Sequence, residues 1–229
     1  MSKTVLIIGA SRGIGKELAL ILAKEPNLKV IALARKTDVM ETFCSHAGID
    51  FHFFDLVSAT VKDDLTAILA KVTQIDFVIN NAGRLVNKPF LELTQEDLRS
   101  CYQINAVGVI EAMQVVVPKM LENGGHIVNV STMGAFQGTV KFPGLLAYST
   151  SKAALTSFTE LFAEEYKETK IKMNCLCLGA AQTEMLEEAF PGYEAPLSAK
   201  EMATYIADFT LNAHRYMNGK IIPVSLTTP

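Results

Sequence analysis

The sequence predicts an α/β protein with a doubly wound parallel sheet of about seven strands and helices on both faces. Short apolar runs that end in small or polar residues are typical of buried parallel strands, and segments with 3.6-residue periodicity separate most of them. A glycine-rich loop directly follows the first run. Together these observations indicate a Rossmann-type arrangement, in which ligands bind beyond the carboxyl ends of the strands.

Seven runs predict strands, and they are KTVLIIG, LKVIALAR, IDFHFFDL, IDFVINNAG, GHIVNVST, IKMNCLCLG and GKIIPVSL. Helices are predicted for GIGKELALILAKE from Gly13, for VKDDLTAILAKV from Val61, and for the long segment from Glu96 to Leu121. Strands and helices alternate, which implies right-handed crossovers. A chain of 229 residues can bury one generous core. We therefore expect a single domain over residues 1–229, with a short substrate lid near 185–198.

Composition and charge narrow the class of partner. With 49% hydrophobic residues, 20% charged residues and a formal net charge of -3, the chain offers no electrostatic reason to bind nucleic acid, so small-molecule partners are expected. The first apolar run is too short for a signal peptide or a membrane span, which predicts a cytoplasmic protein without membrane contact. Histidine and cysteine spacings indicate no metal site. The cysteines are interpreted as reduced core residues, and they are Cys44, Cys101, Cys175 and Cys177.

The loop GASRGIG has the context of a dinucleotide-binding turn, because it joins the first strand to the first helix. Its glycines at 9, 13 and 15 permit a tight turn and let backbone N–H groups approach a pyrophosphate at the positive end of the helix dipole. The loop therefore predicts a nicotinamide dinucleotide as cofactor.

The second strand favours NADP(H) over NAD(H). About 20 residues beyond the loop, an acidic side chain would bind the 2′-hydroxyl of NAD, but the run VIALARK has Ala34 there, followed by Arg35. Arg12 adds a second guanidinium from the loop. Two guanidiniums without a carboxylate suit a 2′-phosphate. The alternative is that Arg35 is a solvated residue at a strand end.

Tyr148 and Lys152 lie one helical turn apart in YSTSK, so their side chains share a helix face. A free tyrosine has a pKa of about 10. A lysine charge at about 4 Å stabilises the phenolate by up to roughly 4 kcal/mol at an effective dielectric near 20. We therefore expect Lys152 to lower the pKa of Tyr148 towards neutrality, where a phenol can act as a general acid and base.

Hydroxyl and amide groups accompany this pair. Ser131 and Thr132 end the strand GHIVNVST, whose carboxyl end should face the same crevice, and either hydroxyl could hold a carbonyl oxygen. Adjacent strand residues point to opposite faces, so only one can serve. Asn105 interrupts an apolar helix, where a buried amide needs partners.

Several motifs follow one another in a fixed order along nearly the whole chain. They are Gly9, Ala10, Ser11, Arg12, Gly13, Ile14 and Gly15 in the loop, then Asp55, Asn80, Asn81, Ala82, Gly83, Asn105, Gly108, Asn129, Val130, Ser131, Thr132, Tyr148, Lys152, Gly179 and Thr183. In this order they resemble the short-chain dehydrogenase/reductase family of the single-domain type. The resemblance implies a homodimer or homotetramer.

The resemblance also implies roles for individual residues. It favours Thr132 over Ser131 as the hydroxyl that positions the substrate, because the Asn-Val-Ser-x register of the family is unbroken here. Tyr148 would exchange a proton with the substrate oxygen, Lys152 would lower its pKa and bind the nicotinamide ribose, and Asn105 would hold a water in the proton relay. On the cofactor, Asp55 would lie near the adenine and the backbone of Asn81 to Gly83 along the adenosine ribose. Thr183 would lie near the carboxamide.

The leading hypothesis is an NADP(H)-dependent oxidoreductase that interconverts a carbonyl and a secondary alcohol by hydride transfer, with Tyr148 as general acid/base. The alternative is a catalytically weak NADP(H)-binding sensor or scaffold protein. The presence of Tyr148, Lys152 and Asn105 together argues against that alternative, because a pure binder does not need all three. A sugar-nucleotide epimerase is disfavoured, since little chain remains after Thr183 for a second ligand domain.

Overall fold

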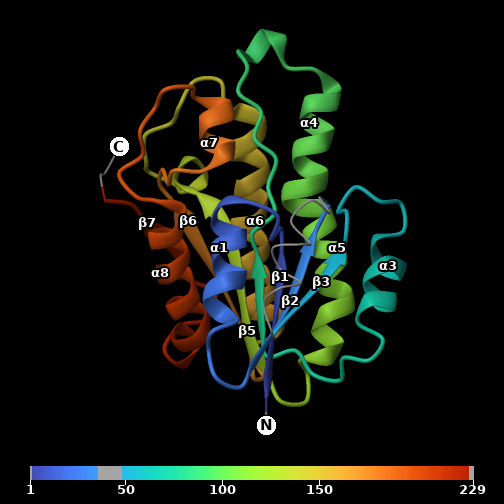
Figure 1. Ribbon diagram of the computed structural model, residues 1–229. Helices are drawn as coiled ribbons and strands as arrows, with labels where there is room; N and C mark the ends of the chain where they lie inside the picture. Colours follow the sequence, from blue (N-terminus) through green and yellow to red (C-terminus); the bar gives the residue numbers. More distant parts are fainter. Residues whose placement is uncertain (1, 36–47, 227–229) are drawn as a thin grey trace.

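The computed structural model describes residues 2–35 and 48–226, and its centre is one sheet of seven parallel strands (Figure 1). The strands are β1 (Lys3–Ile8), β2 (Leu28–Ala34), β3 (Ile49–Phe53), β4 (Phe77–Asn80), β5 (Gly125–Thr132), β6 (Ile171–Leu178) and β7 (Ile221–Val224). Their order across the sheet is β3-β2-β1-β4-β5-β6-β7. The predicted doubly wound sheet is thus confirmed. Strands before β4 are added on one side of β1 and later strands on the other, so the strand order reverses between β1 and β4. Sheets of this kind bind ligands at that point.

Helices cover both faces of the sheet. The longer ones are α1 (Gly13–Leu22), α3 (Val61–Ile68), α4 (Gln95–Tyr102), α5 (Gly108–Val116), α6 (Leu146–Glu165) and α8 (Ala199–Asn212). Shorter ones are the 3₁₀ turns η1 (Phe90–Glu92), η3 (Val117–Lys119), η4 (Met133–Ala135) and η5 (Ala213–Arg215), and the helix α7 (Glu184–Ala189). The alternation of strand residues divides the core: Val5 and Ile7 of β1 pack under α1 and α8, whereas Leu6 and Ile8 pack under α3, α5 and α6.

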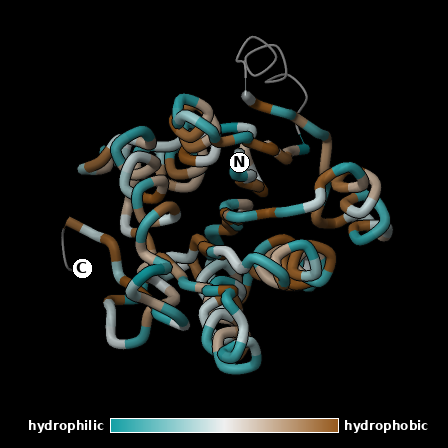
Figure 2. Tube along the Cα trace, turned by 90° about the horizontal axis from the view of Figure 1, so that it is seen from below, coloured by the Kyte–Doolittle hydropathy of each residue, from teal (hydrophilic) through white to brown (hydrophobic). Residues whose placement is uncertain are grey.

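Along most helices, hydrophobic and hydrophilic residues alternate around the helix (Figure 2). This pattern is typical of helices that bury one face against a sheet. In α1, for example, the buried positions are Gly15, Leu18, Ala19 and Leu22, which follow helical spacing. The periodic segments of the sequence therefore become the outer layers of the fold.

The long helix predicted from Glu96 to Leu121 is present, since the chain is helical without a break from residue 95 to 119, but it is not one regular α-helix. A π-helical turn, η2 (Gln103–Val107), separates α4 from α5. Gln103 donates a hydrogen bond to the main-chain oxygen of Leu56 at 3.1 Å, and a Cβ on Gly108 would lie 2.6 Å from that same oxygen. The chain after β3 thus approaches the helix at the π turn, where only glycine leaves room.

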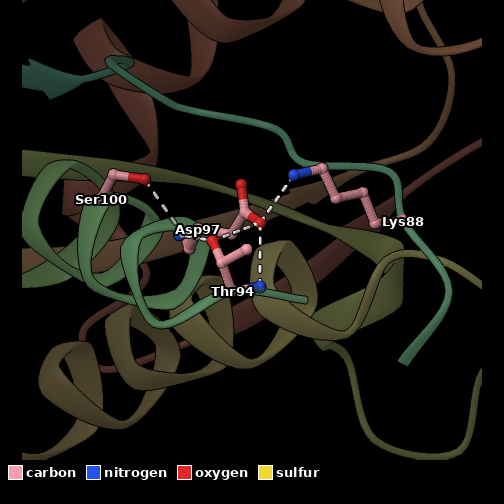
Figure 3. Close-up of polar contacts among 4 residues, drawn as sticks. All are labelled: Lys88, Thr94, Asp97 and Ser100. Carbon is pink, nitrogen blue, oxygen red and sulfur yellow. Dashed lines mark hydrogen bonds and ion pairs between the residues drawn. The ribbon is translucent and has the colours of Figure 1, made fainter. Parts of the chain in front are cut away.

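A tight polar cluster fixes the start of α4 (Figure 3). Thr94 and Asp97 form a reciprocal capping box, and the carboxylate of Asp97 also accepts a hydrogen bond from Lys88 at 2.7 Å. The bond from Lys88 and the bonds from Thr94 lower the pKa of Asp97 to about 2. The cap therefore links the segment after β4 to the start of α4.

The expected lid near 185–198 is part helix and part loop. It begins with α7, continues without regular structure, and ends at Ser198, which caps α8. Within the described residues no helix is long and apolar enough to cross a membrane, and no group of three His, Cys, Asp or Glu side chains could hold a metal ion. Cys101, Cys175 and Cys177 are buried and free. Cys44 lies outside the described residues.

Candidate functional site

A hollow of about 120 Å³ opens at the carboxyl ends of β1, β2 and β4. Eight residues predicted to bind the cofactor line it: Gly9, Ser11, Arg12, Arg35, Asp55, Asn81, Ala82 and Gly83. They come from four separate segments that the parallel sheet brings to one edge. Met185 of α7 also lines the hollow, so the lid helix reaches the same space.

The glycine loop is closed against the chain that follows β4. Gly9 has φ +95°, and a Cβ there would lie 2.5 Å from the backbone nitrogen of Ala82. Asn81 donates to the main-chain oxygen of Gly9 at 2.8 Å, and a Cβ on Gly15 would lie 1.9 Å from that oxygen. Any larger residue at Gly9 or Gly15 would force these segments apart. Glycine at positions 9 and 15 therefore allows the loop to pack closely against the chain after β4.

The start of α1 fits a phosphate group. Gly13 and Ile14 open the helix, and the residue at its N-cap, Arg12, makes no side-chain hydrogen bond to the cap. The first N–H groups of a helix have no intrahelical acceptor, and the helix dipole adds positive potential there. These donors, beside a glycine-lined hollow, match the needs of a dinucleotide pyrophosphate.

Both candidate guanidiniums already have a carboxylate partner. Arg12 forms a two-pronged ion pair with Glu188 of α7, in which Nη2 lies 2.9 Å from Oε2. The Nε of Arg35 lies 3.9 Å from a carboxylate oxygen of Asp55. The sequence-based picture of two guanidiniums without a carboxylate is therefore wrong at Arg12. Nothing local in the sequence marks Glu188, which lies 176 positions further along the chain.

At the next part of the edge, α6 places Tyr148 beside β5. The side chain of Thr132 lies close enough to the phenol to lower its pKa, and its Oγ1 accepts a hydrogen bond from the backbone of Gly134 at 3.3 Å. Ser131 instead donates to the main-chain oxygen of Lys152 at 3.1 Å and is buried. Of the two neighbouring hydroxyls, the one that contacts Tyr148 is that of Thr132.

Lys152 is 2% exposed, and its ammonium donates to the main-chain oxygens of Ala82 at 3.1 Å and Val130 at 2.8 Å. Burial lowers the pKa of Lys152 to about 8. The two hydrogen bonds of Lys152 link the carboxyl ends of β4 and β5.

The pKa of Tyr148 shifts in the direction opposite to the expectation. Burial raises it to about 12, the nearby Cys101 adds to the rise, and the side chain of Thr132 opposes it. Lys152 is not among the causes, because with a pKa of about 8 it is already uncharged at the pH where the phenol titrates. The phenol therefore keeps its proton at neutral pH.

Asn105 has the partners that a buried amide requires. From the π turn, its oxygen accepts from the backbone of Arg84 at 2.7 Å, and its nitrogen donates to Arg84 at 2.9 Å and to Ser151 at 2.8 Å. Ser151 in turn donates to the main-chain oxygen of Tyr148 at 2.8 Å. Asn105 thus joins the segment after β4 to the helix that carries Tyr148 and Lys152.

Thr183 lies between the glycine loop and the lid. Its hydroxyl caps α7 by accepting from Leu186 at 3.2 Å, and its methyl carbon would lie 3.1 Å from a Cβ on Gly13. Sequence reasoning missed Ser151 as part of this site, and it missed the contact of Glu188 with Arg12, although Met185 and Glu188 lie in the predicted lid. Ser151 could have been found, since it stands between Tyr148 and Lys152 in the motif.

Comparisons with known proteins agree with this geometry. A family model described as short chain dehydrogenase matches residues 3–194. The oxidoreductase UcpA of Salmonella typhimurium is 35% identical over 195 residues, which cover 81% of this chain and 72% of that protein. The 3-oxoacyl-(acyl-carrier-protein) reductase FabG of Thermotoga maritima is 30% identical over 192 residues, 81% of this chain and 77% of that protein. A short chain dehydrogenase of Shigella flexneri complexed with NADP has the same fold, with a TM-score of 0.86 at 24% identity over 96% of each chain.

Proposed function

The chain belongs to the short-chain dehydrogenase family, and from this premise we propose that it is an NADP(H)-dependent oxidoreductase that interconverts a carbonyl and a secondary alcohol. The observation that carries the proposal is that Tyr148 lies near the hydroxyl of Thr132, one helical turn from the buried Lys152. The ammonium of Lys152 in turn binds Ala82 at the glycine-lined hollow. A proton donor, a second hydroxyl and a fixed positive charge then meet where a substrate oxygen can bind.

The protein residues have distinct tasks in this proposal. The N–H groups at the start of α1 hold the pyrophosphate, and Arg12 and Arg35 attract the 2′-phosphate. When bound, NADP(H) supplies the hydride. Thr132 holds the substrate oxygen. Tyr148 gives that oxygen its proton, and the positive charge of Lys152 opposes the cost of the phenolate that remains.

The raised pKa of Tyr148 favours one direction of proton transfer. With a pKa of about 12, the phenol keeps its proton at neutral pH, so it is prepared to donate rather than to accept. Carbonyl reduction needs such a donor. The names of the relatives point the same way for those proteins, since one is called a 3-oxoacyl reductase, and 3-oxoacyl thioesters therefore join ketones and quinones as trial substrates.

The test follows NADPH consumption spectrophotometrically over that panel, for the natural chain and for Tyr148→Phe. We expect turnover with NADPH that falls about 10²–10⁴-fold in the variant, because the proton donor is lost. NADPH affinity, measured by fluorescence titration, serves as the control and should stay within about two-fold. Turnover that survives in Tyr148→Phe would refute the role of the tyrosine. NADPH binding without turnover on any substrate would favour a sensor or scaffold protein.

A cytoplasmic location and a homodimer or homotetramer are parts of the same proposal. Exposed apolar side chains on the outer helices support self-association, among them Leu161 of α6, which is 71% exposed. Tyr102 and Val107, near the junction of α4 and α5, are also exposed. Sedimentation equilibrium of the purified chain would test this part, and a monomer at micromolar concentration would contradict it.

A further inference from the structure

We propose that Glu188 tunes cofactor specificity: its carboxylate competes with the 2′-phosphate of the cofactor for the guanidinium of Arg12, and so weakens the preference for NADP(H) over NAD(H). This inference rests on the proposed function, because it assumes that Arg12 receives a 2′-phosphate. It adds a residue from the lid helix to the determinants of cofactor choice. Glu188 is outside the glycine loop and outside the second strand, where those determinants were expected.

The contact is specific in its geometry. Both terminal nitrogens of Arg12 bind the two carboxylate oxygens of Glu188, which is the arrangement that a phosphate would also use. The hydrogen bond to Glu188 is the largest cause that raises the pKa of Arg12, and Glu184 adds to the rise from the same helix. In the absence of a phosphate, the charge of Arg12 is thus already matched by carboxylates of α7.

A 2′-phosphate has to displace Glu188 or share the guanidinium with it. Displacement costs the ion pair. Sharing leaves the free Nε edge of Arg12 for the phosphate but brings two anions to one cation, and their repulsion opposes binding. Either way, the carboxylate reduces the affinity for NADP(H). NAD(H) has a 2′-hydroxyl in place of the phosphate, so the pair of Arg12 with Glu188 can remain intact when it binds.

An opposite effect of Glu188 is smaller. The carboxylate holds Arg12 in one orientation, which could prepare it for a phosphate. However, the two side chains are 34% and 62% exposed, and ordering a solvent-exposed pair contributes little. Repulsion between two anions at the same guanidinium therefore outweighs orientation. Arg35, whose carboxylate partner is more distant at 3.9 Å, remains the less hindered of the two cations.

The experiment measures dissociation constants for NADPH and for NADH by fluorescence titration, without substrate and without turnover. In Glu188→Gln we expect the NADPH affinity to rise about two- to five-fold and the NADH affinity to stay unchanged. The matched control is Glu187→Gln, which removes the same charge from the same helix, where the carboxylate accepts from Gly192 and not from Arg12. In the control the ratio of the two affinities should stay as in the natural chain.

A second pair of variants isolates the route through Arg12. Arg12→Met should weaken the binding of NADPH and leave the affinity for NADH unchanged. Adding Glu188→Gln to Arg12→Met should then have no further effect on either affinity. If Glu188→Gln alone leaves the NADPH affinity unchanged or weakens it, while Arg12→Met still weakens NADPH selectively, the competition is refuted and the proposed cofactor stands. If the natural chain binds NADH better than NADPH, the proposed function fails first, and the inference fails with it.

Discussion

Strand β5 carries a polar cluster near each end, and the two clusters differ in kind. Near the amino end, His126 lies among Asn174 and the main chain of Thr210. At the carboxyl end, Thr132 lies beside Tyr148, above Lys152. Both clusters hold buried polar groups between the sheet and a helix. Only the second is joined to the hollow, since Lys152 donates to the main-chain oxygen of Ala82, which lines it.

The amino-end cluster is closed. The Nδ1 of His126 donates to the carbonyl oxygen of Thr210 at 2.9 Å, so its Nε2 accepts from the amide nitrogen of Asn174, also at 2.9 Å. The amide oxygen of Asn174 accepts from the backbone of Lys220 at 3.0 Å, which fixes its orientation. Burial lowers the pKa of His126 to about 4. Every polar atom of the ring has a partner, and a neutral ring is built into the fold.

The carboxyl-end cluster leaves capacity for a ligand. Tyr148 is only partly buried, and its hydroxyl and that of Thr132 can each bind a further atom. The pKa of Tyr148 is raised to about 12 and that of Lys152 is lowered to about 8, so both groups depart from their usual values beside a hollow. A titratable group with a shifted pKa therefore marks a site when it lies near a hollow and can still form further hydrogen bonds. A shifted pKa alone also occurs in the scaffold.

The largest expected effect separates the two hydroxyls at the end of β5. Thr132→Val should lower turnover about 10- to 10³-fold, because it removes the hydroxyl that contacts Tyr148 while keeping the shape of the side chain. Ser131→Ala is the matched control. It should leave turnover within about three-fold and cost about 1 kcal/mol of stability, since it removes the hydrogen bond from Ser131 to the main-chain oxygen of Lys152. NADPH oxidation and urea unfolding would measure these effects. Loss of turnover in Ser131→Ala alone would reverse the assignment.

The next effect tests whether the amino-end cluster is purely structural. His126→Leu should lower the free energy of unfolding by about 2–4 kcal/mol, because it leaves the oxygen of Thr210 and part of the amide of Asn174 without a partner. Turnover per folded molecule should not change. His52→Gln, at a partly exposed histidine in β3 that contacts Asp50, is the control and should change stability by less than about 1 kcal/mol. A fall in turnover with stability intact would break the comparison.

The smallest effect is a dependence of stability on pH. The folded pKa of His126 is about 4 and the unfolded one about 6.5, so the unfolded chain takes up the proton first as the pH falls. Stability from this group is complete above pH about 6.5 and declines by at most about 3 kcal/mol as the pH approaches 4. Its neighbour His214 has a pKa lowered by burial and acts in the same direction.

Urea unfolding between pH 7 and 4 would show this decline. It should be much smaller in His126→Leu, where only His214 remains in that cluster. Asp97 has a pKa lowered to about 2, so its contribution is lost only below pH about 4. Equal slopes in the two proteins would contradict the assignment to His126.

The sequence predicted the features that depend on residues close to one another along the chain. The apolar runs predicted all seven strands, because a parallel strand buried on both faces must be continuously hydrophobic. The glycine loop and the pair of Tyr148 with Lys152 were predictable for a similar reason. In each case the function depends on a spacing within one element, which is visible in the chain itself.

Contacts between distant segments were not predictable. Glu188 contacts Arg12 across 176 positions, and His126 contacts Thr210 across 84; no periodicity records such pairs. The direction of the Tyr148 pKa shift was also missed, because it depends first on burial, which the spacing of Tyr148 and Lys152 does not reveal. The π turn was missed since apolar residues continue through it, although Asn105 and Gly108 within that run were visible signals.

The π turn of residues 103–107 also sets how this segment can change in length. An α-helix rotates about 100° per residue, and a π turn accommodates one additional residue without passing that rotation on to the next helix. Deleting one residue here would therefore make α4 and α5 a single regular helix without turning the buried face of α5, whereas a deletion inside α4 or α5 would turn a buried face by about 100°. The irregularity thus confines a one-residue difference in length to the segment that carries Asn105.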